Sequence, residues 1–102
     1  MNQQTNIIRL EATLVRFYSP SDESAFFDWL KKIPSVHKIE GHGTSIYIDV
    51  DGASIEEDDL RELLSLFRRY EIDMSQLIKL NRQDFIEWFE NKKAYWYKSI
   101  FV

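Results

Sequence analysis

The sequence has no cysteine, which excludes disulfide bonds, thiolate nucleophiles and cysteine-ligated zinc. A chain without cysteine suits a reducing compartment, so we expect a cytoplasmic protein. Glycine and proline are scarce, with three and two residues among 102, which argues against long disordered segments. No apolar run approaches the roughly 20 residues that a membrane helix needs. The polar residues 1–6 show no signal peptide, and we expect no membrane partner.

Basic residues are also in the minority, with 13 Lys and Arg against 17 Asp and Glu and a net charge of −4. Residues 1–60 carry five basic and eleven acidic side chains, a net charge of −6, and residues 61–102 carry eight and six, a net charge of +2. Proteins that bind a phosphate backbone usually present a basic stripe. We therefore expect no nucleic-acid partner.

The first half of the chain predicts a strand and then a helix. Residues 8–14 alternate apolar and polar side chains, the period of a strand with one buried face. Apolar side chains recur at helical spacing over residues 23–33, after a turn that offers Ser21 or Asp22 as the helix cap. Because proline disfavours helical geometry at the preceding residue, we expect this helix to end just before Pro34.

A β-hairpin is predicted next, with strands at residues 36–40 and 44–50 and a glycine-flanked loop at residues 41–43. The second strand would bury three alternate side chains: Ile46, Ile48 and Val50. Tyr47 and Asp49 would then lie on the opposite face of the sheet.

The second half of the chain predicts further helices. Residues 54–57 form the capping-box pattern of a helix start. Four apolar side chains follow at the spacing of one buried helix face: Leu60, Leu63, Leu64 and Phe67. Residues 75–80 leave two alternatives open, a short helix or a fourth strand. Asn81 is the predicted cap of another helix, and the apolar residues 94–102 are expected to dock on the core.

This element order predicts an α+β fold, β-α-β-β-α plus a C-terminal helix, with a three- or four-stranded, mostly antiparallel sheet and helices on one face. If residues 75–80 form a strand, the fold is ferredoxin-like. A chain of 102 residues is long enough for one core and too short for two. No linker or internal repeat is visible, so we predict a single domain, residues 1–102.

No motif predicts catalysis. Asp49-Val50-Asp51-Gly52 resembles the opening motif of haloacid-dehalogenase-type phosphatases, in which the first Asp is the nucleophile and the second a general acid and base. However, Ala53 stands where that family usually has threonine, and about fifty residues precede the motif. His37 and His42 flank the predicted hairpin and are poorly placed to converge on a metal ion. We predict no catalytic residue, no metal site and no cofactor.

An acidic cluster lies between residues 49 and 59, where no basic residue occurs. Its members are Asp49, Asp51, Glu56, Glu57, Asp58 and Asp59. A helix start accounts for one or two acidic side chains, and the surplus creates a negative field that would steer a basic partner. Two interpretations stay open: a solvated helix start and a partner-binding surface.

Seven of the fifteen aromatic residues lie in the last eighteen positions. Phe85, Trp88 and Phe89 share one helical face, which predicts core packing. Consecutive side chains cannot all face inward, so at least one of Tyr95, Trp96 and Tyr97 should be exposed. Because Tyr and Trp are frequent binding anchors, these three are candidate partner-binding residues, including for a homodimer.

Part of the chain resembles a family of small uncharacterised bacterial proteins. The matching pattern is Leu60-Arg61-Glu62-Leu63-Leu64, then Leu66 to Leu77, Trp88-Phe89, Ala94-Tyr95-Trp96 and Phe101. The resemblance implies a bacterial, cytoplasmic protein and carries no activity. In size and acidity the chain is also similar to immunity proteins that neutralise bacterial toxins.

These observations favour a non-enzymatic protein-binding domain, in its most concrete form an immunity-type inhibitor that presents the acidic cluster to a basic toxin. Two alternatives remain. The first is a homo-oligomerising structural module, and the second is a small-ligand binder or enzyme whose pocket is assembled from scattered residues.

Overall fold

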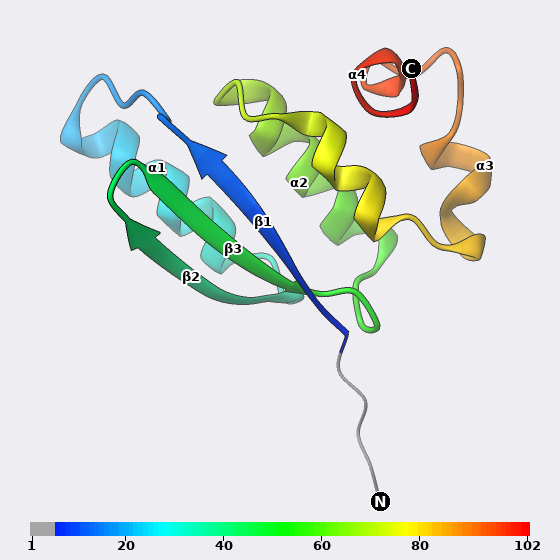
Figure 1. The fold of residues 1–102 in the computed structure, drawn as a ribbon, viewed down its shortest axis with the longest axis horizontal. Helices are drawn as coiled ribbons and strands as arrows, with labels where there is room; N and C mark the ends of the chain where they lie inside the picture. The colour runs from blue at the N-terminus through cyan, green and yellow to red at the C-terminus, as the bar shows by residue number, and fades with distance from the viewer. Residues whose placement is uncertain (1–5) are drawn as a thin grey trace, which may run out of the picture.

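The protein consists of a three-stranded antiparallel sheet with its helices packed on one face (Figure 1). The computed structural model describes residues 6–102. The strands are β1 (Ile7–Thr13), β2 (Val36–His42) and β3 (Ser45–Asp51), in the order β1-β3-β2. The predicted α+β architecture is confirmed.

The strand order follows from the connections. Both outer strands run antiparallel to β3, so β1 and β2 run in the same direction and the chain must cross over β3 to join them. The crossover is α1 (Pro20–Lys31). On the helical face, Leu10 lies opposite Ile48, and both side chains are buried. This is a split β-α-β unit, the first half of a ferredoxin-like fold.

Helix α1 begins earlier than the sequence suggested. The hydroxyl of Ser19 accepts a hydrogen bond from the backbone N–H of Asp22 at 3.1 Å, and Pro20 occupies the first helical position. Proline suits that position because its missing N–H would have no partner there and its φ is already helical. The predicted cap at Ser21 or Asp22 was therefore wrong. The helix ends at Lys31, two residues short of the predicted end just before Pro34.

The hairpin is longer than predicted. Gly41 and His42, expected in the loop, belong to β2 and lie opposite Ile46 and Ser45 of β3. The reversal needs only Gly43 and its neighbour, because Gly43 has a φ of 61°, which glycine adopts without steric strain.

Helix α2 (Glu57–Arg69) carries the centre of the core. Its predicted buried face is confirmed, since Leu60, Leu63, Leu64 and Phe67 have no exposed surface. The predicted cap is wrong by two residues. Glu56 is the N-cap, and its N–H donates to the Asp59 carboxylate at 3.2 Å, the reach-back bond of a capping box.

The ambiguous segment forms a 3₁₀ helix, η1 (Met74–Leu80), and not a fourth strand. Its three buried side chains, Met74, Leu77 and Leu80, recur at every third residue, which is the period of a 3₁₀ helix. The helix packs along β1, where a ferredoxin-like fold would place its last strand (Figure 1). Residues 6–102 therefore contain three strands.

Short turns complete the C-terminal part. Asn81 ends η1 instead of capping a helix, and η2 (Gln83–Phe85) and α3 (Ile86–Phe89) follow. Helix α4 (Tyr97–Phe101) packs against η1, so the predicted docking of the tail is confirmed. Within residues 6–102, no helix is long and apolar enough to cross a membrane.

Candidate protein-binding surfaces

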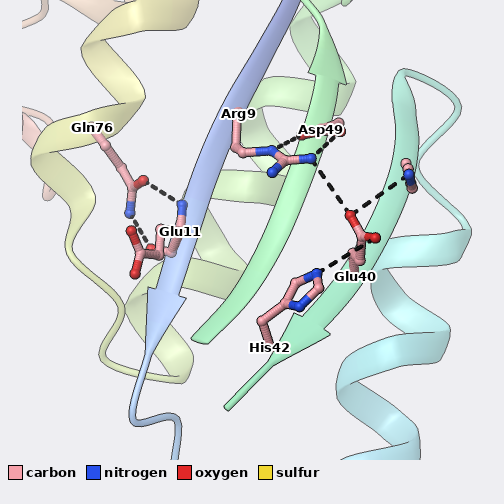
Figure 2. A network of polar contacts seen from close by, with 7 residues as sticks. Arg9, Glu11, Glu40, His42, Asp49 and Gln76 are labelled. Carbon is pink, nitrogen blue, oxygen red and sulfur yellow. Dashed lines mark hydrogen bonds and ion pairs between the residues drawn. The ribbon is translucent and has the colours of Figure 1, made fainter. Parts of the chain in front are cut away.

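The face of the sheet that the helices leave uncovered carries a polar network (Figure 2). Arg9 of β1 donates two hydrogen bonds to Asp49 of β3, at 2.8 Å from Nε and 3.1 Å from Nη2. Its guanidinium also lies 3.6 Å from Glu40 and 5.0 Å from the centre of the Tyr47 ring. This pairing follows from the register, because Arg9 lies directly opposite Asp49.

Arg9 controls the ionisation of Asp49. Its hydrogen bond holds the Asp49 pKa below the ordinary value, against the opposing effect of burial, since Asp49 is only 7% exposed. Lys38 and His42 lie 3.6 and 3.5 Å from Glu40, so charges of both signs meet across this face. The predicted partner residue Asp49 is thus engaged within the chain.

The acidic cluster divides into engaged and exposed members. Asp51 accepts the N–H of Ala53 at 3.0 Å, and this bond lowers the Asp51 pKa. Asp59 is 8% exposed and accepts the N–H of Glu56. Together with Asp49, half of the six predicted residues therefore stabilise the fold.

The other three acidic residues are exposed at the start of α2: Glu56 as its N-cap, and Glu57 and Asp58 in its first turn. Glu57 accepts a hydrogen bond from Arg61, one turn later in the helix, at 2.8 Å. The acidic members in the strand and in the following turn therefore have different partners from those at the start of α2.

The three C-terminal aromatic residues behave differently from one another. Trp96 is buried, and its Nε1–H donates to the Phe89 carbonyl at 2.7 Å. Tyr97 is half-buried and stacks on Phe101, whereas Tyr95 is 52% exposed. The prediction that they cannot all face inward is confirmed, and Tyr95 is the exposed one.

Sequence reasoning missed the loop between β1 and α1. Leu14 adopts a φ of 57°, a conformation that bulky side chains rarely take, and is 72% exposed. After Leu14, successive side chains point alternately toward the core and toward solvent. Val15 and Phe17 pack against the core, whereas Arg16 and Tyr18 are exposed, Tyr18 at 81%. In the sequence, the apolar Val15 and Phe17 break the alternation of residues 8–14, but the positive φ that causes this change of face leaves no sequence signal.

This loop borders a hollow of about 620 Å³ at the end of the sheet, which we call the sheet-end hollow. It lies between the loop, α1 and the hairpin tip, and its lining includes Leu14, Phe17, Phe27, Gly41, Gly43 and Ile46. A Cβ added at Gly41 or Gly43 would meet no atom within 4 Å, so the missing side chains help to keep this space open. A second hollow of about 410 Å³ lies beside Leu14, Arg16, Tyr18 and Arg69.

Among residues 6–102, no three His, Cys, Asp or Glu side chains stand together in a way that could hold a metal ion. His42 contacts Tyr47 and Glu40 on the open face of the sheet, and His37 is exposed at the irregular start of β2. The absence of a cofactor stays a prediction.

Comparison with protein-family models, with curated proteins and with solved structures gave no match to this chain. The resemblance to a small bacterial family and the likeness to immunity proteins therefore stay predictions, and the function has to be inferred from the surfaces described above.

Proposed function

We propose that this chain is a non-enzymatic protein-binding domain whose contact surface is the sheet-end hollow together with the exposed side chains of Leu14, Arg16 and Tyr18. The observation that carries the proposal is Leu14, a leucine in a left-handed backbone conformation with 72% of its surface exposed. Such strain is concentrated at binding and catalytic sites.

Within the described residues, the Leu14 conformation is held by a backbone hydrogen bond from its N–H to the Thr44 carbonyl at 2.9 Å, and not by burial of its side chain. A left-handed conformation costs a leucine about 1–2 kcal/mol. Burial of the side chain could offset that cost, but Leu14 is largely exposed. The left-handed conformation of Leu14 orients the loop that follows it. Val15 and Phe17 then point toward the core, and Arg16 and Tyr18 point toward solvent. A partner that covers Leu14 and Tyr18 would bury the apolar surface that this loop leaves in water.

The surface defines the chemistry of the partner. The sheet-end hollow takes an apolar side chain, because its lining exposes more apolar than polar surface. Arg16, at its edge, forms no ion pair with any carboxylate of residues 6–102 and can bind an acidic group of the partner. Tyr and Arg are the residues most often found at energetic centres of interfaces.

The test is site-specific crosslinking in cells of the native host. A photoreactive phenylalanine analogue at position 18 should crosslink one protein, and Gly41→Val in the same chain should abolish the crosslink by filling the hollow. Valine adds no backbone strain in a strand with open space at that position.

The control places the same analogue at Ile78, an exposed apolar position on η1. Absence of a specific crosslink from position 18, equal crosslinks from positions 18 and 78, or a crosslink unaffected by Gly41→Val would each contradict the proposal.

A second candidate is the immunity-type inhibitor of a basic toxin, in the bacterial cytoplasm. It is favoured by the three exposed acidic side chains at the start of α2, Glu56, Glu57 and Asp58. If this surface binds the toxin, replacing all three by lysine should abolish protection of cells that express it, and binding should weaken as salt rises. Protection that survives this replacement would remove the candidate.

A further inference from the structure

A shallow hollow near the C-terminal end of α2, away from its acidic start, has the composition of an anion site. Four residues line it: Ser65, Arg68 and Arg69 of α2, and Tyr95 of the segment before α4. The hollow measures about 470 Å³, and none of its lining residues is acidic. Two of its lining side chains therefore carry a guanidinium group and two carry a hydroxyl group.

Both arginines are available for a ligand. Neither Arg68 nor Arg69 forms an ion pair or a side-chain hydrogen bond with any of residues 6–102. By contrast, Arg9, Arg61 and Arg82 each have a carboxylate partner within 3.0 Å. The guanidinium group matches the geometry of phosphate and carboxylate oxygens and gains most when it binds them in pairs of hydrogen bonds.

Tyr95 is held in position and is not a loose surface side chain. Its ring packs edge-on against Trp96, with 5.0 Å between ring centres and 79° between planes. Trp96 is itself fixed by burial and by its hydrogen bond to the Phe89 carbonyl. The Tyr95 ring therefore lines the hollow while it packs on a fixed neighbour.

We infer that the hollow lined by Ser65, Arg68, Arg69 and Tyr95 binds a phosphate group carried by a small molecule. None of these four residues borders the sheet-end hollow, and Ser65, Arg68 and Tyr95 also lie outside the hollow of about 410 Å³ that Arg69 shares with Leu14, Arg16 and Tyr18. The inference therefore does not rest on the proposed function. The last turn of a helix carries a partial negative charge that repels anions. The two arginines must supply the attraction, so binding should depend strongly on both.

The test is a titration of ¹⁵N-labelled protein followed by NMR, with inorganic phosphate, adenosine 5′-monophosphate and adenosine as separate probes. Both phosphate compounds should produce saturable shifts in residues 65–70 and in Tyr95, and adenosine alone should not. Arg68→Gln and Arg69→Gln should each weaken phosphate binding about tenfold or more, as expected for loss of a charge-assisted hydrogen bond.

The two phosphate probes distinguish the source of the ligand. Tighter binding of the nucleotide than of inorganic phosphate would mean that Tyr95 stacks on the carrier, and Tyr95→Ala should then remove the difference while Tyr95→Phe keeps it. Equal affinity would mean that the phosphate group alone is recognised. Both results require the arginines.

The control is Lys31→Gln with Lys32→Gln, which removes two positive charges from the exposed end of α1. This variant should bind phosphate as the unmodified chain does. The inference is overturned if sodium chloride at the same ionic strength reproduces the shifts, if Arg68→Gln with Arg69→Gln keeps full affinity, or if no saturation occurs up to about 10 mM.

Discussion

Arg9 and Asp49 show how one residue pair contributes to the pH response of this fold. The hydrogen bond from Arg9 lowers the Asp49 pKa in the folded state, so the unfolded state binds protons more readily at this carboxyl. The stability that the pair provides is fully present above the unfolded pKa of about 3.9 and is lost as the pH falls through the folded pKa.

We therefore predict that acidification below about pH 4 destabilises the protein in part through Asp49. In the Arg9→Gln variant, the Asp49 pKa should rise, because burial remains and the lowering partner is gone. NMR titration of the Asp49 carboxyl carbon measures this change directly. Lys79→Gln, which removes an exposed charge on η1, is the control and should leave the Asp49 pKa unchanged. An Asp49 pKa that stays low without Arg9 would disprove the coupling.

Leu14 provides a second prediction at the scale of a single residue. Its φ of 57° is strained for any side chain with a Cβ and is free of strain for glycine. Leu14→Gly should therefore be about 1 kcal/mol more stable than Leu14→Ala, which keeps the strain, in urea unfolding. Equal stability of the two variants would mean that the loop relaxes and that the conformation is not enforced.

Among the elements, η1 occupies the position of a fourth strand and forms hydrogen bonds with the backbone of β1, as a strand would. Gln76 uses its side-chain amide as a strand uses its backbone: Oε1 accepts the N–H of Glu11, and Nε2 donates to the Glu11 carbonyl, both at 2.8 Å (Figure 2). These two groups lie on the outer edge of β1, away from β3. An edge strand with free groups is a template for association with other chains, and η1 covers it.

We predict that Gln76→Ala destabilises the protein by about 1–2 kcal/mol, since two hydrogen bonds to the edge strand are lost. The variant should also self-associate more readily, because the β1 edge becomes accessible. Urea unfolding and light scattering measure the two effects. Gln83→Ala, at an exposed position in η2, is the matched control and should change neither. Unchanged stability in Gln76→Ala would show that packing alone holds η1.

At the scale of elements, the spacing of apolar residues decided which helices and strands could be predicted from sequence. Helix α2 was predicted well because its buried residues follow the period of an α-helix over three turns. Residues 75–80 were undecided because periodicity over so few residues cannot distinguish a short helix from a strand. Helix caps were missed because several Ser, Asp and Glu residues compete near each start, and the chain outside the helix selects among them.

On the scale of the whole molecule, the C-terminal tail closes the core. Ile100 of α4 is buried, and Phe101 packs on Phe89 with 5.1 Å between ring centres. We predict that Ile100→Ala destabilises the protein by about 2–4 kcal/mol. Val102→Ala, at a position 90% exposed, should have no measurable effect.

The same experiment tests the prediction of a single domain. If the tail and the sheet share one core, tryptophan fluorescence and far-ultraviolet circular dichroism should report the same unfolding transition in urea. Ile100→Ala should shift this transition to a lower urea concentration. Two separate transitions would show that the C-terminal turns unfold independently and would contradict the single-domain prediction.

The candidate surfaces were only partly predictable from sequence. Tyr95 was found because three consecutive aromatic side chains cannot all be buried, which is a local constraint. The acidic cluster was predicted as one surface because its members are close in sequence. The structure separates them, because the Asp49 side chain meets Arg9 across a strand pair while Glu56, Glu57 and Asp58 sit on a helix start. The sheet-end hollow joins residues about thirty positions apart and left no local pattern.

By itself, the sequence determined which segments of this protein are amphipathic and whether their apolar residues recur with the period of a helix or of a strand. This is a local property, because a segment buries one face in either structure whatever it packs against. It therefore determined the α+β class, the buried face of α2 and the exclusion of thiol chemistry. Only the tertiary structure decided that η1 covers the edge of β1, that Leu14 is strained beside a hollow, and that Arg68 and Arg69 meet Tyr95 without an acidic neighbour in that hollow. Each of these three features depends on contacts between residues that are distant in the sequence, and such contacts form only when the chain folds.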